Sequence, residues 1–262
     1  MPLTGFDEPH ILPPPPTLVS HPQFLSLTIA STLLTMTHLT RKVLCIGRNY
    51  ADHISELKNA VPKQPFFFLK PPSSILKPNM GPILRPKGVS LHYELELALV
   101  LNQSLCNLFP DFSKVQAKDA IKGYYLALDL TARNVQDEAK KKGLPWTIAK
   151  GFDTFLPISE FVPASEIPDF DQVHLQLAVN DKVVQSDSTE LMMFKIPTIL
   201  SHCSNIMTLE EDDIILTGTP KGVGEIFPSD MLRGELSVGG KTLASIAVTV
   251  EDKPGFYEYK ST

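Results

Sequence analysis

The sequence contains little cysteine. Its three cysteines, Cys45, Cys106 and Cys203, are scattered over 262 residues, and no two of them are spaced as a CxxC pair. An odd, dispersed set of this kind indicates neither a disulfide framework nor a zinc site. We therefore expect the protein to work in a reducing intracellular compartment.

The sequence also lacks a long, clean apolar run. Residues 25–34 are broken by Ser and Thr and follow a proline-rich stretch, so they predict neither a membrane span nor a signal peptide. A mitochondrial presequence would contain arginine, yet Arg41 is the first Lys or Arg, and Asp7 and Glu8 precede it. The residues alone leave targeting open.

A strong charge of one sign is missing as well. The 24 Lys and Arg residues against 29 Asp and Glu residues give a net charge of -5. This balance excludes a general basic field for nucleic acid or an anionic membrane. An anionic substrate must therefore be held by a local site, such as a metal ion.

Two regions differ in character. Residues 1–40 contain the run Pro13–Pro16, which favours polyproline geometry, followed by a Ser/Thr-rich stretch without a usable period. We expect a poorly ordered extension that could serve in targeting, and Met36 could start a shorter translated form. Residues 41–262 are expected to form a single globular domain.

From residue 41 onward the hydrophobic pattern predicts many strands and few helices. Helices are expected at 49–58 and 135–142, and strands at 42–47, 65–71, 89–101, 124–130, 173–184, 214–220 and 241–250. The sequence contains no internal repeat. This pattern indicates a β-rich α+β fold.

Three carboxylates lie in apolar sequence. Glu94 and Glu96 are two residues apart in a predicted strand, so both face one side, where they repel each other unless a cation lies between them. Asp129 ends another apolar run. The set suits an oxygen-preferring ion, Mg²⁺ or Mn²⁺. Two alternatives stay open, in which the glutamates line a solvated strand face and Asp129 serves as a turn or cap.

Further polar residues could do chemistry beside such an ion. His53 and Glu56 are three apart on a predicted helix, which suits a general base with an orienting carboxylate. Lys150 follows an apolar segment and could stabilise an oxyanion. Residues 216–224 form a Gly/Thr turn able to hold a carboxylate, but without the Gly-Lys-Ser/Thr ending of a phosphate-binding loop. Alternatives stay open here too: a surface His–Glu contact on a solvated helix, a surface lysine, and a tight turn that Gly and Pro explain equally well.

An ordered series of motifs resembles the fumarylacetoacetate hydrolase family. The matching segments are GRNYADH at 47–53, FLKP at 68–71, HYELEL at 92–97, LDLTARNVQDE at 128–138, KGLPWTIAK at 142–150 and LTGTPKGVG at 216–224. The series is most similar to the small mitochondrial branch of acylpyruvases, oxaloacetate decarboxylases and oxaloacetate tautomerases. Residues 1–40 lie outside the resemblance.

The resemblance implies a mixed β-sandwich roll, a homodimer, and Mg²⁺ or Mn²⁺ held by Glu94, Glu96 and Asp129. It makes His53 and Glu56 a catalytic dyad on a lid, with Lys150 as the active-site lysine. The remaining implied residues are substrate-binding: Arg48, Arg133, Gln136 and Thr219. Tyr93 departs from the relatives that have histidine there, at a position that is not a ligand.

The implied activity is that of an enzyme acting on short 2-oxo acids through a metal-bound enolate. Acylpyruvate hydrolysis and oxaloacetate decarboxylation both lead to a metal-bound pyruvate enolate, and oxaloacetate keto–enol tautomerisation needs only proton transfer at C3 through an enolate. Two alternatives remain, a dienoate hydratase or isomerase of the same superfamily and a non-catalytic member that binds 2-oxo acids. The resemblance also implies a mitochondrial location, with a cytoplasmic one as the alternative.

Overall fold

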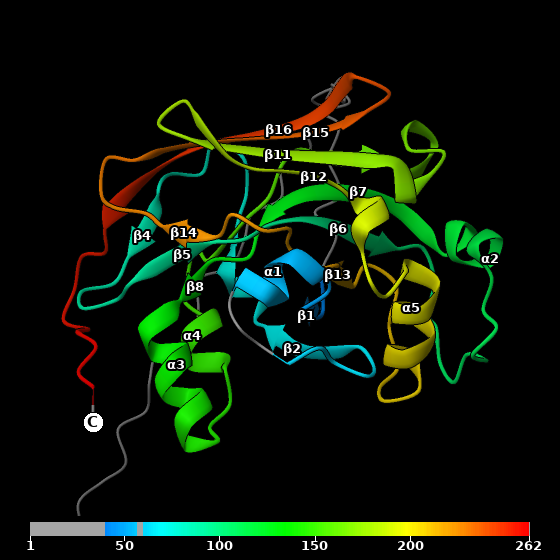
Figure 1. Cartoon of the computed structure of the whole chain (residues 1–262), viewed down its shortest axis with the longest axis horizontal. Helices are drawn as coiled ribbons and strands as arrows, with labels where there is room; N and C mark the ends of the chain where they lie inside the picture. The colour runs from blue at the N-terminus through cyan, green and yellow to red at the C-terminus, as the bar shows by residue number, and fades with distance from the viewer. Residues whose placement is uncertain (1–39, 57–59, 262) are drawn as a thin grey trace, which may run out of the picture. The chain divides into compact units, whose positions relative to one another are not determined.

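The computed structural model describes residues 40–56 and 60–261, which belong to one compact unit. The predicted N-terminal extension therefore lies, apart from residue 40, outside the described residues. Strands dominate and helices are few, so the predicted β-rich α+β fold is confirmed. The chain folds around two larger sheets and two small ones (Figure 1).

A six-stranded sheet carries most of the candidate site. Its strands follow the order β10 (Val162–Pro163), β7 (Ile121–Leu128), β6 (Leu95–Leu101), β13 (Ile214–Leu216), β1 (Val43–Gly47) and β2 (Phe66–Lys70). Every residue of β6 is buried. The strand alternates leucines on one face with Glu96, Ala98 and Val100 on the other, because successive side chains of a strand point to opposite faces.

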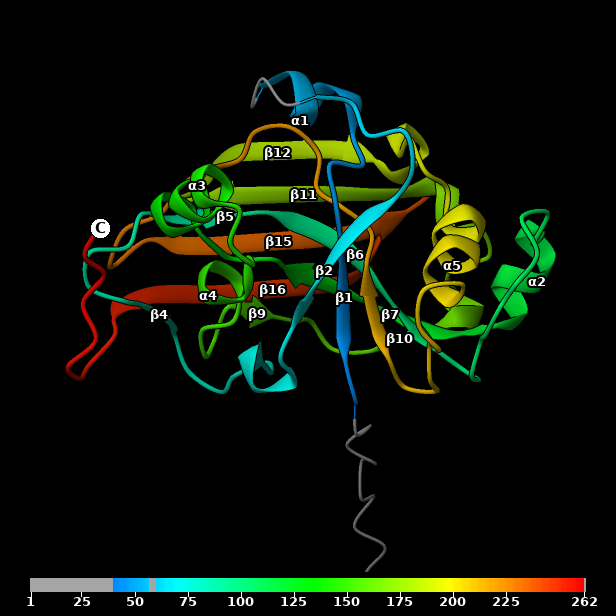
Figure 2. The same cartoon turned by 90° about the horizontal axis from the view of Figure 1, so that it is seen from below.

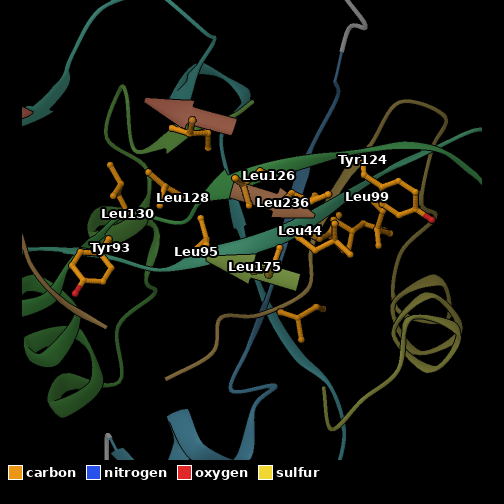
Figure 3. Close-up of a cluster of buried hydrophobic side chains, with 14 of the residues drawn as sticks. Leu44, Tyr93, Leu95, Leu99, Tyr124, Leu126, Leu128, Leu130, Leu175 and Leu236 are labelled. Atoms are coloured by element: carbon orange, nitrogen blue, oxygen red, sulfur yellow. The ribbon is translucent and has the colours of Figure 1, made fainter. Parts of the chain in front are cut away.

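A five-stranded sheet packs on the leucine face. Its order is β12 (Lys182–Ser188), β11 (Val173–Val179), β15 (Met231–Val238), β16 (Lys241–Asp252) and β4 (Ile83–Arg85). In Figure 2 its long strands run across the view while β1 crosses them. The core between the sheets includes Leu95, Leu126, Leu175 and Leu236 (Figure 3). The gap is narrow, since a Cβ on Gly234 would lie 3.2 Å from Leu95 and Leu126 side-chain atoms.

The smaller elements fill in around these sheets. Strands β14 (Gly224–Glu225), β5 (Leu91–Tyr93) and β8 (Thr131–Ala132) form one sheet, and β3 (Ile75–Leu76) pairs with β9 (Leu156–Pro157). The α-helices are α1 (Ala51–Glu56), α2 (Lys114–Asp119), α3 (Arg133–Lys142), α4 (Thr147–Lys150) and α5 (Ile196–Ser204). Short 3₁₀ turns cover Pro72–Ser74, Ala164–Glu166, Phe170–Gln172 and Thr189–Leu191. In the described part of the chain, no helix is both long and apolar enough to cross a membrane.

Two predicted strands are wrong in their extent. The stretch 89–101 is interrupted at Glu94, and its halves β5 and β6 join different sheets. The stretch 173–184 contains a hairpin, because Asn180 and Asp181 both have positive φ angles (49° and 66°) and turn the chain between β11 and β12. Two such residues form the type I′ turn that matches the twist of paired strands.

The helix predicted at 49–58 starts later than expected. It begins at Ala51, and residues 57–59 lie outside the described part of the chain. Arg48 has a φ of 57°, which places it in the left-handed region and separates β1 from the helix. The Asn49 side chain donates to the carbonyls of Thr217 and Phe194, so it joins two turns.

Candidate active site

All but one of the predicted site residues line a single pocket. Its lining includes Arg48, His53, Glu94, Glu96, Asp129, Arg133, Gln136, Lys150 and Thr219, while Glu56 is not among them. These residues come from α1, β6, α3, α4 and the loops after β1, β5, β7 and β13. The sheet therefore gathers residues that are up to 171 positions apart in the chain.

The three predicted carboxylates converge at the inner end of this pocket. Glu94, Glu96 and Asp129 are all at least 93% buried by exposed fraction (7%, 2% and 1% exposed), and each offers an oxygen within 4.8 Å of the others. Backbone pairing enforces the approach, since the Asp129 amide donates to the Glu94 carbonyl at 2.8 Å. The alternative of a solvated strand face is wrong for both glutamates, and Asp129 caps no helix.

Glu94 and Asp129 are each balanced by cations. Arg133 Nη2 donates to Glu94 Oε1 at 2.6 Å, and Lys150 Nζ donates to Glu94 Oε2 at 2.9 Å and to Asp129 Oδ2 at 2.7 Å. Burial alone would lower the pKa of Lys150, but the charges of Asp129 and Glu94 outweigh it and raise the pKa. Lys150 is therefore a buried ammonium, and the surface alternative for it is wrong.

A second buried lysine also pairs with Asp129 and was absent from the predicted site. Lys70, at the end of β2, lies 2.9 Å from Asp129 Oδ1 and donates to the Leu130 carbonyl at 3.1 Å. The contact with Oδ1 is an ion pair whose angle does not make a hydrogen bond, so that oxygen has no hydrogen-bond partner among the described residues. A lysine between an apolar strand and a proline was the only local signal.

Glu96 is the carboxylate without a balancing cation. Its Oε2 accepts a 2.6 Å hydrogen bond from the Gly218 amide, and no ion pair joins it to any lysine or arginine in the described ranges. Burial, followed by the negative charges of Asp129 and Glu94, raises the pKa of Glu96 well above its usual value. The site thus stabilises a further positive charge next to Glu96.

The residues present fit a divalent metal ion. The three buried carboxylates bring their oxygens together and make a donor set of hard ligands. One of these oxygens, Asp129 Oδ1, lacks a hydrogen bond among the described residues, and Glu96 lacks a balancing cation there. Two adjacent anions at this depth are costly until a cation joins them. The described part of the chain could hold Mg²⁺ or Mn²⁺ at this position.

His53 lies on the pocket side of α1 and is 6% exposed. Its Nδ1 is 3.5 Å from Glu56 Oε2, a charge contact that does not form a hydrogen bond, and Nδ1 has no other partner in the described residues. Burial lowers the pKa of His53, although the charges of Glu94 and Glu56 oppose that effect. Near neutral pH the ring is therefore uncharged, as a general base requires.

The loop after β13 is held in place by hydrogen bonds to several elements. The Gly222 amide donates to both Glu56 oxygens at 3.2 and 3.1 Å, and Thr219 Oγ1 donates to the Leu95 carbonyl at 2.8 Å. Gln185 Nε2 donates to Thr219 Oγ1 at 2.9 Å. The hydroxyl proton of Thr219 is thus used in the hydrogen bond to β6. Gln185, a distant residue of β12, supports this loop, and the sequence did not reveal that role.

Arg133 and Gln136 form a connected pair on α3. Arg133 Nη1 donates to Gln136 Oε1 at 2.7 Å, which orients the guanidinium whose other end binds Glu94. Arg133 Nε is buried without a hydrogen-bond partner among the described residues. The pair therefore presents an unused donor next to the carboxylate cluster.

Comparison with known proteins identifies relatives of this chain. A family model described as fumarylacetoacetate (FAA) hydrolase C-terminal matches residues 42–251. A mitochondrial oxaloacetate tautomerase of Saccharomyces cerevisiae is 45% identical over 251 residues, which cover 85% of this chain and 96% of the relative. A mitochondrial oxaloacetate decarboxylase of Dictyostelium discoideum is 45% identical over 194 residues, covering 74% and 87%.

Solved structures agree with this relationship. A yeast fumarylacetoacetate hydrolase family protein superposes with a TM-score of 0.78 at 45% identity, covering 85% of this chain and 97% of that one. Fumarylpyruvate hydrolase from Pseudomonas aeruginosa, solved with Mn²⁺ and pyruvate, has a TM-score of 0.73 at 29% identity, covering 82% and 91%. By the extent of these matches, this chain belongs to the fumarylacetoacetate hydrolase family.

Proposed function

We propose that this chain is a divalent-metal-dependent enzyme that interconverts the keto and enol forms of oxaloacetate and also decarboxylates it, in each case through an enolate stabilised at the same site. The observation that carries the proposal is the meeting of an uncharged, buried His53 with a buried carboxylate triad and the ammonium of Lys150 in one pocket. The tautomerase and decarboxylase names of the relatives support the choice of oxaloacetate.

The residues divide the reaction between a base and a stabilised oxyanion. His53, neutral near pH 7, takes a proton from C3 of the keto acid, and the electron pair moves onto the C2 oxygen. Lys150 and Arg133 carry positive charge on the pocket wall where that oxygen becomes negative. Return of the proton to oxygen completes tautomerisation. In decarboxylation the keto form loses carbon dioxide from C4 in place of a proton from C3, and the resulting pyruvate enolate takes a proton at C3 to give pyruvate.

Glu94, Glu96 and Asp129 would hold Mg²⁺ or Mn²⁺. When bound, the ion supplies Lewis-acid polarisation of the 2-oxo group. The solved relative with Mn²⁺ and pyruvate supports this ligand chemistry. Glu56 keeps His53 on the pocket side by binding the Gly222 amide and by its charge.

Acylpyruvate hydrolysis is a further proposed outcome of the same site. His53 would then activate a water that attacks the distal carbonyl, and carbon–carbon cleavage would release a carboxylic acid together with the pyruvate enolate. The fumarylpyruvate hydrolase relative supports this reaction. The dienoate isomerase alternative has similar solved structures in its favour, among them a 2-hydroxyhepta-2,4-diene-1,7-dioate isomerase from Mycobacterium marinum at 36% identity. The oxaloacetate enzymes at 45% identity favour oxaloacetate over it. A non-catalytic binder has no specific observation in its favour.

The relatives named as mitochondrial proteins support a mitochondrial location for this chain. The family resemblance also supports a homodimer, as do exposed large apolar side chains at Leu144 (52%) and Ile148 (56%).

The test is an assay of oxaloacetate that follows enol decay separately from pyruvate release. With Mg²⁺, the purified enzyme should accelerate enol–keto exchange at least about a hundredfold over the same buffer with Mg²⁺ and no enzyme, which is a modest acceleration for an enzyme. Exhaustive chelation should abolish the acceleration and added Mg²⁺ should restore it. Full activity after chelation would overturn the metal assignment, and no activity with Mg²⁺ or Mn²⁺ would overturn the function.

The same assay tests the base. His53→Gln should reduce the rate by about 10²- to 10⁴-fold, the usual contribution of a general base. Because burial holds the pKa of His53 below its ordinary value of 6.5, wild-type activity should rise with pH below 6.5 and level off by that value. His174→Gln, which changes a histidine exposed on β11, is the matched control and should leave the profile unchanged.

A further inference from the structure

The solvent-facing side of the pocket carries two cations that the proposed reaction does not use. Arg48 and Lys140 both line it, Arg48 from the turn after β1 and Lys140 from the last turn of α3. The Lys140 side chain is 29% exposed, so it lies farther out than the buried Lys150. Figure 1 shows α3 beside α4, the helix that ends in Lys150.

Aromatic rings hold these cations in place. The Arg48 guanidinium lies 5.8 Å from the Phe66 ring centre, and Lys140 Nζ lies 5.4 Å from that of Trp146. The two rings pack edge to face, with centres 5.2 Å apart. Cation–π contacts of this kind position a charge without neutralising it. Both side chains therefore keep their positive charge available to a ligand.

A second stack of rings connects the outer cation with the inner one. Lys150 Nζ lies 4.7 Å from the Phe68 ring centre, and the Phe68 and Trp146 rings are 5.5 Å apart. One continuous wall thus runs from Lys150, beside the carboxylates, to Lys140 at the solvent side. A ligand that lies along this wall meets positive charge at both ends.

Within the described part of the chain, the positive charges of Arg48 and Lys140 are not matched by carboxylates on the pocket wall. Among the described residues, the carboxylates that line the pocket are Glu94, Glu96 and Asp129, all at its inner end. Glu94 and Asp129 already pair with Arg133, Lys150 and Lys70. Lys140 has one weak partner, Asp137 at 3.4 Å, which is 52% exposed, and Arg48 has no ion pair in the described ranges. Burial and then the charge of Arg133 lower the pKa of Lys140, as expected for a cation among cations.

The backbone at Arg48 supports a functional placement. Its φ of 57° is a left-handed conformation that costs a non-glycine residue about 1 kcal/mol or more. The neighbouring Asn49 compensates by bonding three backbone groups: the carbonyls of Thr217 and Phe194 and the amide of Phe194. The fold thus sustains a strained turn that directs an arginine to the pocket.

We propose that Lys140, assisted by Arg48, binds the second carboxylate of a dicarboxylic 2-oxo acid and makes the enzyme selective for dianionic over monoanionic substrates. The inference rests on the proposed function, because it assigns the inner end of the pocket to the 2-oxo acid group. A neutral acyl tail gains nothing from the outer cations, whereas a carboxylate pairs with both. Lys140 is a specificity-determining residue, distinct from the groups that move the proton.

The test compares substrates with and without the distal carboxylate. Lys140→Gln should raise the KM for oxaloacetate about ten- to a hundredfold, the range for losing one charged hydrogen bond, with kcat changed less than about threefold. The KM for acetylpyruvate, whose tail is neutral, and the inhibition constant of pyruvate should stay within about twofold. Lys140→Arg should recover most of the affinity for oxaloacetate.

Lys141→Gln is the matched control, because it removes an exposed charge one residue away on the same helix. It should leave both KM values unchanged. Equal weakening of oxaloacetate and acetylpyruvate by Lys140→Gln, or weakening of neither, would overturn the inference. Failure of the proposed function is visible separately, as absence of oxaloacetate turnover in the wild-type enzyme.

Discussion

At the scale of single residues, the two neighbouring glutamates have opposite electrostatic roles. Glu94 holds Arg133 and Lys150 through both of its oxygens, so it is needed for charge balance even without a metal ion. Within residues 40–56 and 60–261, Glu96 has the Gly218 amide as its one hydrogen-bond partner and faces two other anions. The same residue type two positions apart therefore stabilises the metal-free fold in one case and destabilises it in the other.

This difference predicts opposite effects of two isosteric substitutions in metal-free protein. Glu94→Gln removes the carboxylate partner of Arg133 and one of the two carboxylate partners of Lys150, and should cost about 3–5 kcal/mol of unfolding free energy. Glu96→Gln removes a repulsion and should raise Tm by about 2–4 °C, equivalent to about 1 kcal/mol for a chain of this size. Calorimetry without metal measures both values.

Addition of Mg²⁺ provides the second half of that comparison. It should stabilise the wild-type protein, since a ligand that binds only the native state raises stability by mass action, and should stabilise neither variant. Glu211→Gln, at an exposed surface position, is the control and should behave as wild type. Equal destabilisation by both pocket substitutions would contradict the assignment of roles.

At the scale of elements, strand β12 supports a loop that is far away in sequence. Gln185 lies on β12, is 1% exposed, accepts from the Leu95 amide at 3.0 Å, and donates to Thr219 Oγ1 and to the Pro220 carbonyl at 2.9 and 2.8 Å. One side chain thus joins β12, the start of β6 and the loop after β13. Since Gly218 in that loop binds Glu96, the carboxylate cluster depends on this support.

Replacing Gln185 by leucine should therefore damage both stability and catalysis. The Leu95 amide and the Pro220 carbonyl would be buried without partners, at a cost of about 1–3 kcal/mol each. We expect a loss of about 2–5 kcal/mol in urea unfolding and a fall in kcat of at least tenfold. Lys182→Gln, an exposed change on the same strand, should alter neither. Full activity in Gln185→Leu would show that the loop needs no such support.

At the scale of the whole molecule, the packing of the sheets stabilises a buried polar site. The six-stranded sheet is covered on its leucine face by the five-stranded sheet, and its other face holds a smaller apolar cluster that includes Cys45, Ala98 and Ala127. The carboxylates and lysines lie at the strand ends beside this cluster, where water is largely excluded. Low exposure strengthens every charge interaction in the site.

The proposed homodimer is tested at this scale. Light scattering after size exclusion should give a mass about twice the 29.0 kDa of one chain at micromolar concentration. Leu144→Glu together with Ile148→Glu, in the exposed apolar patch at α4, should leave the secondary structure intact in circular dichroism. A monomeric mass of the wild-type protein would contradict the prediction.

Much of the fold was predictable from the sequence because strands and helices depend on near neighbours. The apolar runs marked β1, β2, β7 and β13 within a few residues, and the motif series indicated the family. The extent of two strands was wrong where one or two residues decided the outcome. Glu94 interrupts its strand, and its carbonyl accepts a hydrogen bond from the Asp129 amide. Asn180 and Asp181 turn the chain between β11 and β12.

The sequence by itself determined which residue types are present for chemistry, and the motif series singled out nearly all that line the pocket. The tertiary structure decided how their charges are balanced. Lys150 meets Glu94 across 56 residues and Asp129 across 21, and Lys70, Gln185 and Lys140 enter only when distant strands and helices come together. Charge balance depends on distance in space, and distances between remote residues are set by how the sheets pack.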